Sequence, residues 1–337
     1  MLEKPDLQEE KIAACLQDEY RLPEAQVAFL PLGADQNTAV YRVVAQDNAP
    51  YFLKLRSGAF DQTSVDLPKY LNDQGIHAII APLATAAGRL WACLGDFKTI
   101  LYPFVQGQDG YGVALSERQW RKFGAALKSI HTTALPMELA ERIPRETYSP
   151  QWRQAVKRFL ALVETETFVD PVAVKLAAFL RAKRAETLDL VERAGQRLRE
   201  LQTRPQELVL CHSDLHAGNI LIDGRGALYI VDWDNSILAP KERDLMYPGG
   251  GQGFSGHTPQ EEEALFYRGY GPVQFDPAAL AYYRYERIVQ DIAVFCEQLL
   301  LTDEGGADRE QSFHYLVSNF LPGGTVEITY QADKTEN

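Results

Sequence analysis

The chain has 337 residues, enough for two lobes or domains, and 46% of them are hydrophobic, which is ordinary for a soluble globular protein. Its 34 Lys and Arg stand against 46 Asp and Glu, a net charge of −12. That balance argues against a nucleic-acid partner, because binding to phosphate backbones requires a basic surface. It is compatible with a small cationic substrate, although acidity is also a common means of keeping a protein soluble.

The first twenty residues alternate charged and apolar positions at helical spacing and contain no long apolar run. We therefore expect neither a signal peptide nor a membrane span. The four cysteines are far apart and form no Cys-x-x-Cys pair, which favours reduced thiols in a cytoplasmic protein. A monomer or a homodimer is expected.

A strand meander is predicted after the first helix, and a short helix at 64–74, ended by Gly75, should follow it. A turn at 47–50 separates the second and third strands. The predicted strands are 27–30, 39–43, 51–55, 79–80 and 99–102. Residues 1–105 are therefore expected to form a lobe built on an antiparallel sheet.

Helices dominate after a hinge at 102–107, and their starts are well marked. Ser116 is an expected N-cap, and an N-cap followed by proline is predicted at four more starts: Ser149, Asp170, Thr258 and Asp276. A β-rich segment, 208–211 and 220–231, lies among these helices, and it contains a hairpin with its turn at 223–226. The fold class is therefore α+β and bilobal, with a small sheet lobe (1–105) and a larger, mainly helical lobe (108–337).

The stretch His-Ser-Asp-Leu-His-Ala-Gly-Asn at 212–219 carries the chemistry. Phosphoryl transfer needs a carboxylate that accepts the proton of the attacking hydroxyl, and oxygen ligands for the Mg²⁺ that bridges the nucleotide phosphates. Asp214 is the candidate for the first role. Asn219 and Asp232, which ends the next apolar strand, are the candidates for the second.

These residues also allow simpler interpretations. A lone Asp and Asn in a loop are usually turn formers, but here the flanking strands, the hairpin and Asp232 are all present. His212 is expected to bond loop backbone and hold Asp214 in place, and the role of His216 stays open. A metal hydrolase using both histidines is disfavoured, because the loop lacks the helical His-Glu-x-x-His arrangement and an evident third ligand.

With these motifs, LCHSDLHAGNILI followed by YIVDWDN, the chain resembles the aminoglycoside phosphotransferase and choline kinase family, relatives of the protein kinases. The resemblance covers nearly the whole chain and implies a kinase-like fold with ATP and Mg²⁺ as cofactors. It also implies that Asp214 is catalytic and that Asn219 and Asp232 bind the metal.

On the nucleotide side, Lys54 in the third strand would clamp the α- and β-phosphates, although a strand lysine is ordinarily a solvent-facing residue. Its acidic partner is unclear; Asp66 is the candidate. The loop 32–38 has one glycine and matches no phosphate-loop pattern, but its position resembles the phosphate loop of the family. The hinge should offer backbone groups to adenine. The expected nucleotide-binding residues are Lys54, Asp35, Asn37, Tyr102, Phe104, Val105 and Asp66.

For the acceptor, an acidic and aromatic wall is predicted that would bind an ammonium-bearing sugar through ion pairs and cation–π contacts. The alternative is that these acids form structural ion pairs, with Arg243, Arg284 and Arg287 as partners. The Gly-rich stretch 249–253 is interpreted as a flexible loop. The expected substrate-binding residues are Asp214, Trp233, Asp234, Glu242, Asp244, Tyr285, Glu286 and Asp291.

Within the family, the stretches LAPKERDLM, YYRYERIVQDIAV and YSPQWR are most similar to the spectinomycin phosphotransferases. This resemblance implies transfer to a hydroxyl of an aminocyclitol or aminoglycoside antibiotic, with spectinomycin first. Two alternatives stay open: a kinase of another small hydroxyl metabolite, such as an amino alcohol or a sugar, and a nucleotide- or drug-binding protein without turnover.

Overall fold

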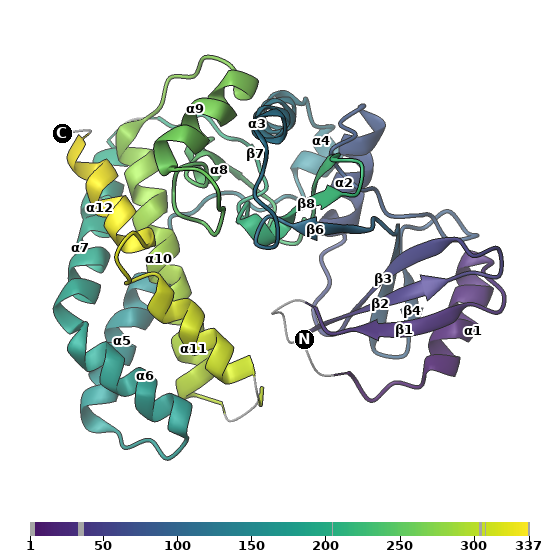
Figure 1. The fold of residues 1–337 in the computed structure, drawn as a ribbon, viewed down its shortest axis with the longest axis horizontal. Coiled ribbons are helices and arrows are strands. Elements are labelled where there is room, and N and C mark those ends of the chain that lie inside the picture. Colours follow the sequence, from purple (N-terminus) through teal and green to yellow (C-terminus); the bar gives the residue numbers. More distant parts are fainter. Residues whose placement is uncertain (1–3, 33–36, 204, 303–304, 307, 336–337) are drawn as a thin grey trace. The chain divides into compact units, whose positions relative to one another are not determined.

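The computed structural model describes residues 4–32, 37–203, 205–302, 305, 306 and 308–335, and they form two compact units (Figure 1). The sheet unit comprises Met1–Pro144 and His212–Ile237, and the helical unit comprises Arg145–Cys211 and Leu238–Asn337. The 212–219 loop thus belongs to the same unit as the N-terminal sheet, although the chain reaches it only after the first helices of the helical unit. A lobe boundary at 102–107 stays a prediction.

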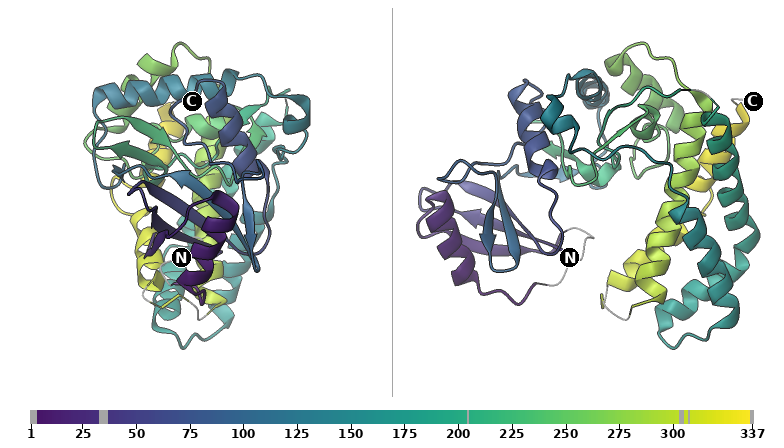
Figure 2. Two further views of the ribbon diagram at one scale, coloured as in Figure 1. Left: turned by 90° about the vertical axis from the view of Figure 1, so that its right-hand side faces the viewer. Right: turned by 180° about the vertical axis from the view of Figure 1, so that it is seen from behind.

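A five-stranded antiparallel sheet forms the first part of the sheet unit. Helix α1 (Glu9–Tyr20) covers one of its faces (Figure 2), where Ile12 and Leu16 join the core that contains Tyr41 and Leu53. In spatial order the strands are β1 (Gln26–Leu30), β2 (Thr38–Val44), β3 (Pro50–Arg56), β5 (Phe97–Pro103) and β4 (Ala92–Leu94).

Four of the five strands predicted in this part of the chain are confirmed as β1, β2, β3 and β5, and β4 was not predicted. The predicted strand 79–80 is wrong, since Ile79 makes one isolated bridge to Ile230. The reason is local: the Asn72 amide donates to the Ile79 carbonyl at 2.7 Å. Pro82, which has no N–H to extend a ladder, follows three residues later.

A second, three-stranded sheet carries the predicted hairpin, β8 (Ile220–Asp223) and β9 (Leu228–Ile230), with the short strand β6 (Gly107–Asp109) on the other edge of β8. The Asp223 carboxylate shapes the hairpin turn by accepting the backbone N–H groups of Arg225 and Ala227. The hairpin ends one residue earlier than predicted, since β9 stops at Ile230, and the Val231 N–H makes one further bond to the Asn219 carbonyl.

Three helices complete the sheet unit: α2 (Thr63–Asp73), α3 (Glu117–Thr132) and α4 (Met137–Ala140). Helix α3 begins as predicted at Ser116, where Ser116 and Gln119 form a capping box. Its apolar face is turned into the core, where Trp120 and Phe123 are fully buried.

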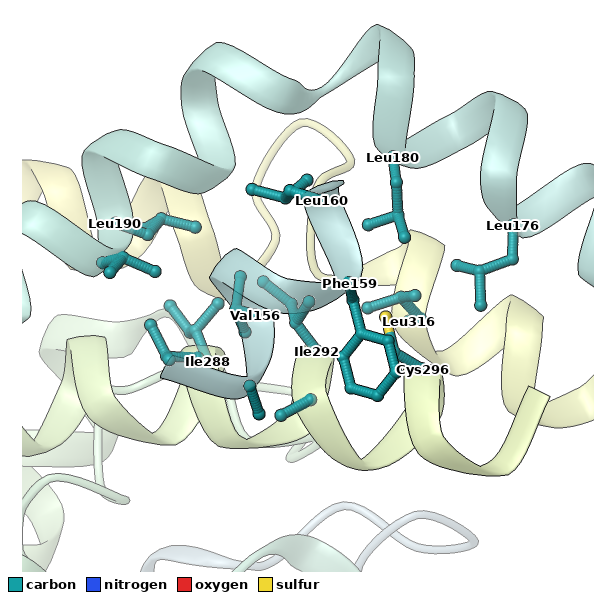
Figure 3. Packing of buried hydrophobic residues seen from close by; sticks show 14 of the residues in the cluster. Val156, Phe159, Leu160, Leu176, Leu180, Leu190, Ile288, Ile292, Cys296 and Leu316 are labelled. Carbon is teal, nitrogen blue, oxygen red and sulfur yellow. The ribbon is translucent and has the colours of Figure 1, made fainter. Parts of the chain in front are cut away.

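The helical unit packs its helices around one apolar core (Figure 3), in which Phe159 of α5, Leu176 of α6 and Ile292 of α10 meet. Asp170, Thr258 and Asp276 are the predicted N-caps, and each is followed by proline; the Ser149 helix instead begins one residue later, with Pro150 as its cap. The elements are α5 (Gln151–Thr165), α6 (Pro171–Ala182), α7 (Arg184–Leu201), β7 (Val209–Cys211), β10 (Ile237–Ala239), α8 (Glu242–Leu245), α9 (Pro259–Tyr270), α10 (Pro277–Leu300), α11 (Asp308–Ser318) and α12 (Thr325–Thr335).

Across the part of the chain that the structure describes, every helix is too short or too polar to span a lipid bilayer.

Candidate functional site

The 212–219 loop is built on a buried histidine. His212 has no exposed surface, and its Nδ1 accepts the backbone N–H of Asp214 at 3.3 Å. Because Nδ1 is an acceptor, the ring proton lies on Nε2, which donates to the Val231 carbonyl at 2.9 Å. His212 therefore ties the loop to the strand before Asp232, and the expectation that it bonds loop backbone is confirmed.

Two residues of this region adopt the left-handed backbone region that L-residues rarely occupy. Ser213 has φ 67° and Asp232 has φ 64°. The Ser213 hydroxyl donates to the carbonyl of Asn235, which links the loop to the segment after Asp232. Such backbone conformations persist where the surrounding structure enforces them, and they are concentrated at functional sites.

Asp214 and Asn219 are joined within the loop. The Asn219 side-chain NH₂ donates to the Asp214 backbone carbonyl at 2.8 Å. A carbonyl can only accept, so this bond identifies the nitrogen of the amide and leaves Asn219 Oδ1 as the atom that could coordinate a metal. The side chain of Asp214 is 18% exposed, which is compatible with access to a reacting hydroxyl.

A cluster of two cations and two acids lies beside the loop. The Lys54 ammonium is 2.8 Å from Asp234 Oδ2 and 3.2 Å from Asp232 Oδ1. The Arg56 guanidinium also pairs with Asp234. Lys54 and Arg56 project from the same face of β3, two residues apart, as the period of a strand requires.

Burial lowers the pKa of the Lys54 ammonium, but the carboxylates of Asp232 and Asp234 outweigh it and hold that pKa above the ordinary value. Lys54 is therefore a fixed positive charge, suited to binding phosphate oxygens. For the neighbouring Tyr102 phenol, whose charged form is the anion, burial raises the pKa, and this side chain therefore remains neutral.

The prediction of Asp66 as the partner of Lys54 is not supported by the geometry. Asp66 pairs with Arg142 at 2.7 Å, whereas Lys54 pairs with Asp232 and Asp234. Asp66 lies in the first turn of α2, and its ion pair with Arg142 joins this helix to the segment that follows α4.

The donor set of Asn219 and Asp232 fits Mg²⁺, which prefers amide and carboxylate oxygens and retains several waters. The side chain of Asp232 is 47% exposed, so its carboxylate is open to solvent as well as bound to Lys54. The groups that could hold the ion are therefore the carboxylate of Asp232 and the amide oxygen Oδ1 of Asn219.

The predicted hinge residues lie at the end of β5. The N–H of Phe104 donates to the Pro50 carbonyl at 3.3 Å, so this group continues the β3–β5 ladder, and the Arg42 guanidinium lies 5.5 Å from the Phe104 ring centre. Tyr102 and Val105 are partly buried. The Asn37 carbonyl accepts the backbone N–H of Ser57, and Asp35 lies outside the described residues.

Trp233 is 4% exposed, and its indole N–H donates to the Ile230 carbonyl at 3.2 Å. Its ring meets the edge of His212, with ring centres 4.7 Å apart. Trp233 therefore packs against His212 and helps to hold that ring in place.

Most of the acids predicted to bind substrate from the helical unit have partners inside that unit. Glu286 is 4% exposed and pairs with Arg153 at 3.1 Å, and Asp291 pairs with Arg287, which lies one turn earlier on α10. Burial raises the pKa of Glu286 to about 7, although Arg153 opposes this shift.

The other three residues of the helical unit that were predicted to bind substrate are buried: Glu242, Asp244 and Tyr285. Glu242 accepts the backbone N–H of Asp276, and the Tyr285 hydroxyl donates to Asp333. These pairings favour the structural ion-pair alternative, with Arg287 as one expected partner and Arg153 as one that was not expected.

The Gly-rich stretch 249–253, interpreted from the sequence as a flexible loop, is hydrogen-bonded to two neighbouring segments. Glu262 accepts the N–H of Gly249 at 3.0 Å, and Thr325 donates to the carbonyl of Gly251. A side chain at Gly249, where φ is 68°, would collide with Glu263.

Sequence reasoning missed two residues of the site, Arg56 and Tyr111. Arg56 could have been found from the strand period, because it is two residues from Lys54 on the same face. Tyr111, whose hydroxyl lies 3.2 Å from His216 Nδ1, follows the short strand β6 and carries no motif in the sequence.

Comparison with known proteins identifies this arrangement. Residues 28–283 match the model of the APH phosphotransferase enzyme family, a span that contains β2, β3, the 212–219 loop and most of the helical unit. Protein StrN of Streptomyces griseus is 24% identical over 223 residues, which are 64% of this chain and 67% of StrN.

Solved structures agree. The crystal structure of spectinomycin phosphotransferase with ADP and spectinomycin aligns with a TM-score of 0.90 and 35% identity, over 98% of this chain and all of the other. A choline/ethanolamine kinase family protein from Mesorhizobium loti aligns with a TM-score of 0.55 at 14% identity, over 97% of this chain and 100% of that one, which shows the shared kinase-like fold. The chain is therefore a member of the APH phosphotransferase family, a nucleotide-using kinase with the α+β protein-kinase-like fold predicted from its sequence.

Proposed function

We propose that this protein transfers the γ-phosphate of ATP to a hydroxyl of an aminocyclitol antibiotic, with spectinomycin as the first candidate. The observation that carries the proposal is the alignment with spectinomycin phosphotransferase, at 35% identity over essentially the full length of both chains. At 14% identity, the choline/ethanolamine kinase family protein shares only the fold, so it does not point to an acceptor.

In this proposal Asp214 orients the acceptor hydroxyl and takes its proton as the bond to phosphorus forms. Its backbone is held by His212 and by the Asn219 amide, so the carboxylate starts from a fixed position. Preorganisation of this kind supplies much of the rate of a reaction in which little covalent chemistry falls to the protein.

The nucleotide is proposed to lie along β3 and the hinge. Lys54 would bind the phosphate oxygens, Asn219 and Asp232 would hold Mg²⁺, which neutralises charge on the phosphates when bound, and Asp35 and Asn37 would contribute from the loop after β1. Tyr102, Phe104 and Val105 would line the adenine site. Lys54 and Asp232 are already in contact, which supports a joint role.

For the ammonium groups of the acceptor, the proposal favours Asp214 and Asp291, whose carboxylates are partly exposed. The same role was predicted for Trp233, Glu242, Asp244, Tyr285 and Glu286. All five are buried, so the alternative for each of them is a structural role.

The test is an acceptor panel. The purified protein is incubated with ATP and Mg²⁺ and with spectinomycin, a 2-deoxystreptamine aminoglycoside, an amino alcohol or a hexose, and ADP release is measured. The proposal expects kcat/KM for spectinomycin to exceed that for the other acceptors at least about tenfold. A higher kcat/KM for the amino alcohol or the hexose would replace the proposed acceptor, and acceptor-independent ADP release alone would contradict it.

A further inference from the structure

The second histidine of the loop, His216, is held in one orientation. Its Nδ1 accepts the backbone N–H of Gly218 at 3.1 Å and thereby caps the 3₁₀ turn η1 (Ala217–Asn219). The Tyr111 hydroxyl lies 3.2 Å from the same nitrogen. Two groups thus converge on Nδ1 from different parts of the sheet unit.

Stacking fixes the plane of the ring. The Tyr111 and His216 rings lie 5.8 Å apart at an angle of 22°. Gly218 allows this approach, since a Cβ at that position would lie 2.7 Å from Tyr111 Cε2 and 2.9 Å from His216 Cε1. Any residue other than glycine would displace the pair.

These contacts determine where the proton of the neutral ring lies. A backbone N–H is always a donor, so Nδ1 must be an acceptor and the proton must be on Nε2. His216 Nε2 lies 3.8 Å from Asp214 Oδ2. The N–H of a locked imidazole is therefore close to one oxygen of the proposed catalytic base.

We propose that His216 is a positioning residue: its Nε2–H holds Asp214 Oδ2, so that Oδ1 is left to receive the proton of the acceptor hydroxyl. Tyr111 acts through His216 by locking the ring. This inference rests on the proposed role of Asp214 as the base. A separation of 3.8 Å is longer than a formed hydrogen bond, and catalytic hydrogen bonds of this kind commonly shorten when substrate binds.

Two substitutions separate the positioning role from the capping role. In His216→Asn the amide oxygen can still accept the Gly218 N–H, because asparagine is a good N-cap, but nothing reaches Asp214. In His216→Gln the longer side chain can carry an N–H toward Asp214. The matched control is His77→Asn, an exposed histidine of the same unit.

We expect His216→Asn to keep the wild-type Tm and the KM for ATP and to lower kcat about 10- to 50-fold, and His216→Gln to recover at least about fivefold of that loss. Tyr111→Phe, which keeps the stacked ring, should lower kcat only about two- to threefold. A wild-type kcat in His216→Asn would overturn the proposal. So would a loss of kcat that is the same in both His216 variants and is accompanied in both by a lower Tm.

A second measurement does not depend on the acceptor. Long-range ¹H–¹⁵N spectra of the ring nitrogens, with His216 assigned by comparison with His216→Asn, should show the Nε2–H tautomer; the Nδ1–H tautomer would overturn the inference. If the wild type releases no ADP with spectinomycin, the proposed acceptor fails, and the same kcat series is then read from ATP hydrolysis with water as acceptor.

Discussion

The ammonium of Lys54 lies 2.8 Å from the carboxylate of Asp234, two residues beyond the proposed metal ligand Asp232. The partner of Lys54, the proposed phosphate-binding residue, thus comes from the segment after β9, whereas the sequence pointed to Asp66 on α2. One short stretch of chain therefore carries both the proposed metal ligand and an acid that pairs with Lys54.

Asp234→Asn keeps the shape of the side chain and removes its charge. We expect the KM for ATP to rise about 5- to 20-fold, because a charge-assisted bond of about 1–2 kcal/mol to Lys54 is lost. Steady-state kinetics with ATP and with the acceptor varied in turn would measure it. A rise confined to the KM of the acceptor would instead support the substrate-binding role predicted for Asp234.

Asp214→Asn should lower kcat by on the order of 10²–10⁴-fold and leave nucleotide affinity unchanged, because the amide cannot take the proton of the attacking hydroxyl. Nucleotide affinity is measured by calorimetry with a non-hydrolysable ATP analogue. A comparable loss of nucleotide affinity would mean that Asp214 has a structural role.

Asp232→Ala should remove the dependence of nucleotide binding on Mg²⁺, because one of the two proposed oxygen ligands is lost and Lys54 keeps only Asp234. The measurement is the Kd of ATP with and without Mg²⁺, compared with Asp223→Ala, which alters an acid of the hairpin turn. If the variant keeps the Mg²⁺ dependence of the wild type, Asp232 is not a ligand.

Glu286→Gln separates a substrate ligand from a structural ion pair. Because Glu286 is 4% exposed and bound to Arg153, we expect the KM for spectinomycin to stay within about twofold of the wild type. The comparison variant is Asp291→Asn, whose carboxylate is more exposed. A rise in the acceptor KM of more than about tenfold in Glu286→Gln would show that this acid binds the substrate.

Glu262→Gln should flatten the pH dependence of stability. Burial raises the pKa of Glu262 to about 7 from 4.5, so the folded state binds a proton that the unfolded state releases between these values. Its contribution is complete below pH 4.5 and is lost as pH rises toward 7, by at most ~3 kcal/mol. Urea unfolding at several pH values measures it. The same pH slope in Glu262→Gln and in the exposed-site control Glu297→Gln would contradict the assignment.

The strands and helix starts that depend on a few consecutive residues could be predicted from the sequence. Short apolar runs predicted β1, β2 and β3, and the cap residues Ser116, Asp170, Thr258 and Asp276 marked their helix starts. Such features depend on a few consecutive residues. The strand at 79–80 failed because a side chain, Asn72, takes the carbonyl that a ladder would need.

Pairings between distant residues were the part that could not be predicted. Lys54 and Asp234 are 180 residues apart, and Arg153 and Glu286 are 133 apart. Several arginines could have neutralised Glu286, and only the packing of α5 against α10 selects Arg153. The Tyr111–His216 pair is of the same kind, since no spacing rule links β6 to the loop.

The most direct test of the central claim is mass spectrometry of spectinomycin after incubation with the wild-type protein, ATP and Mg²⁺, beside an identical reaction with Asp214→Asn. The account predicts that spectinomycin gains the mass of one phosphoryl group with the wild-type protein, and that the variant yields little of this product in the same time. Unmodified spectinomycin in the wild-type reaction, or equal phosphorylation by both proteins, would contradict it.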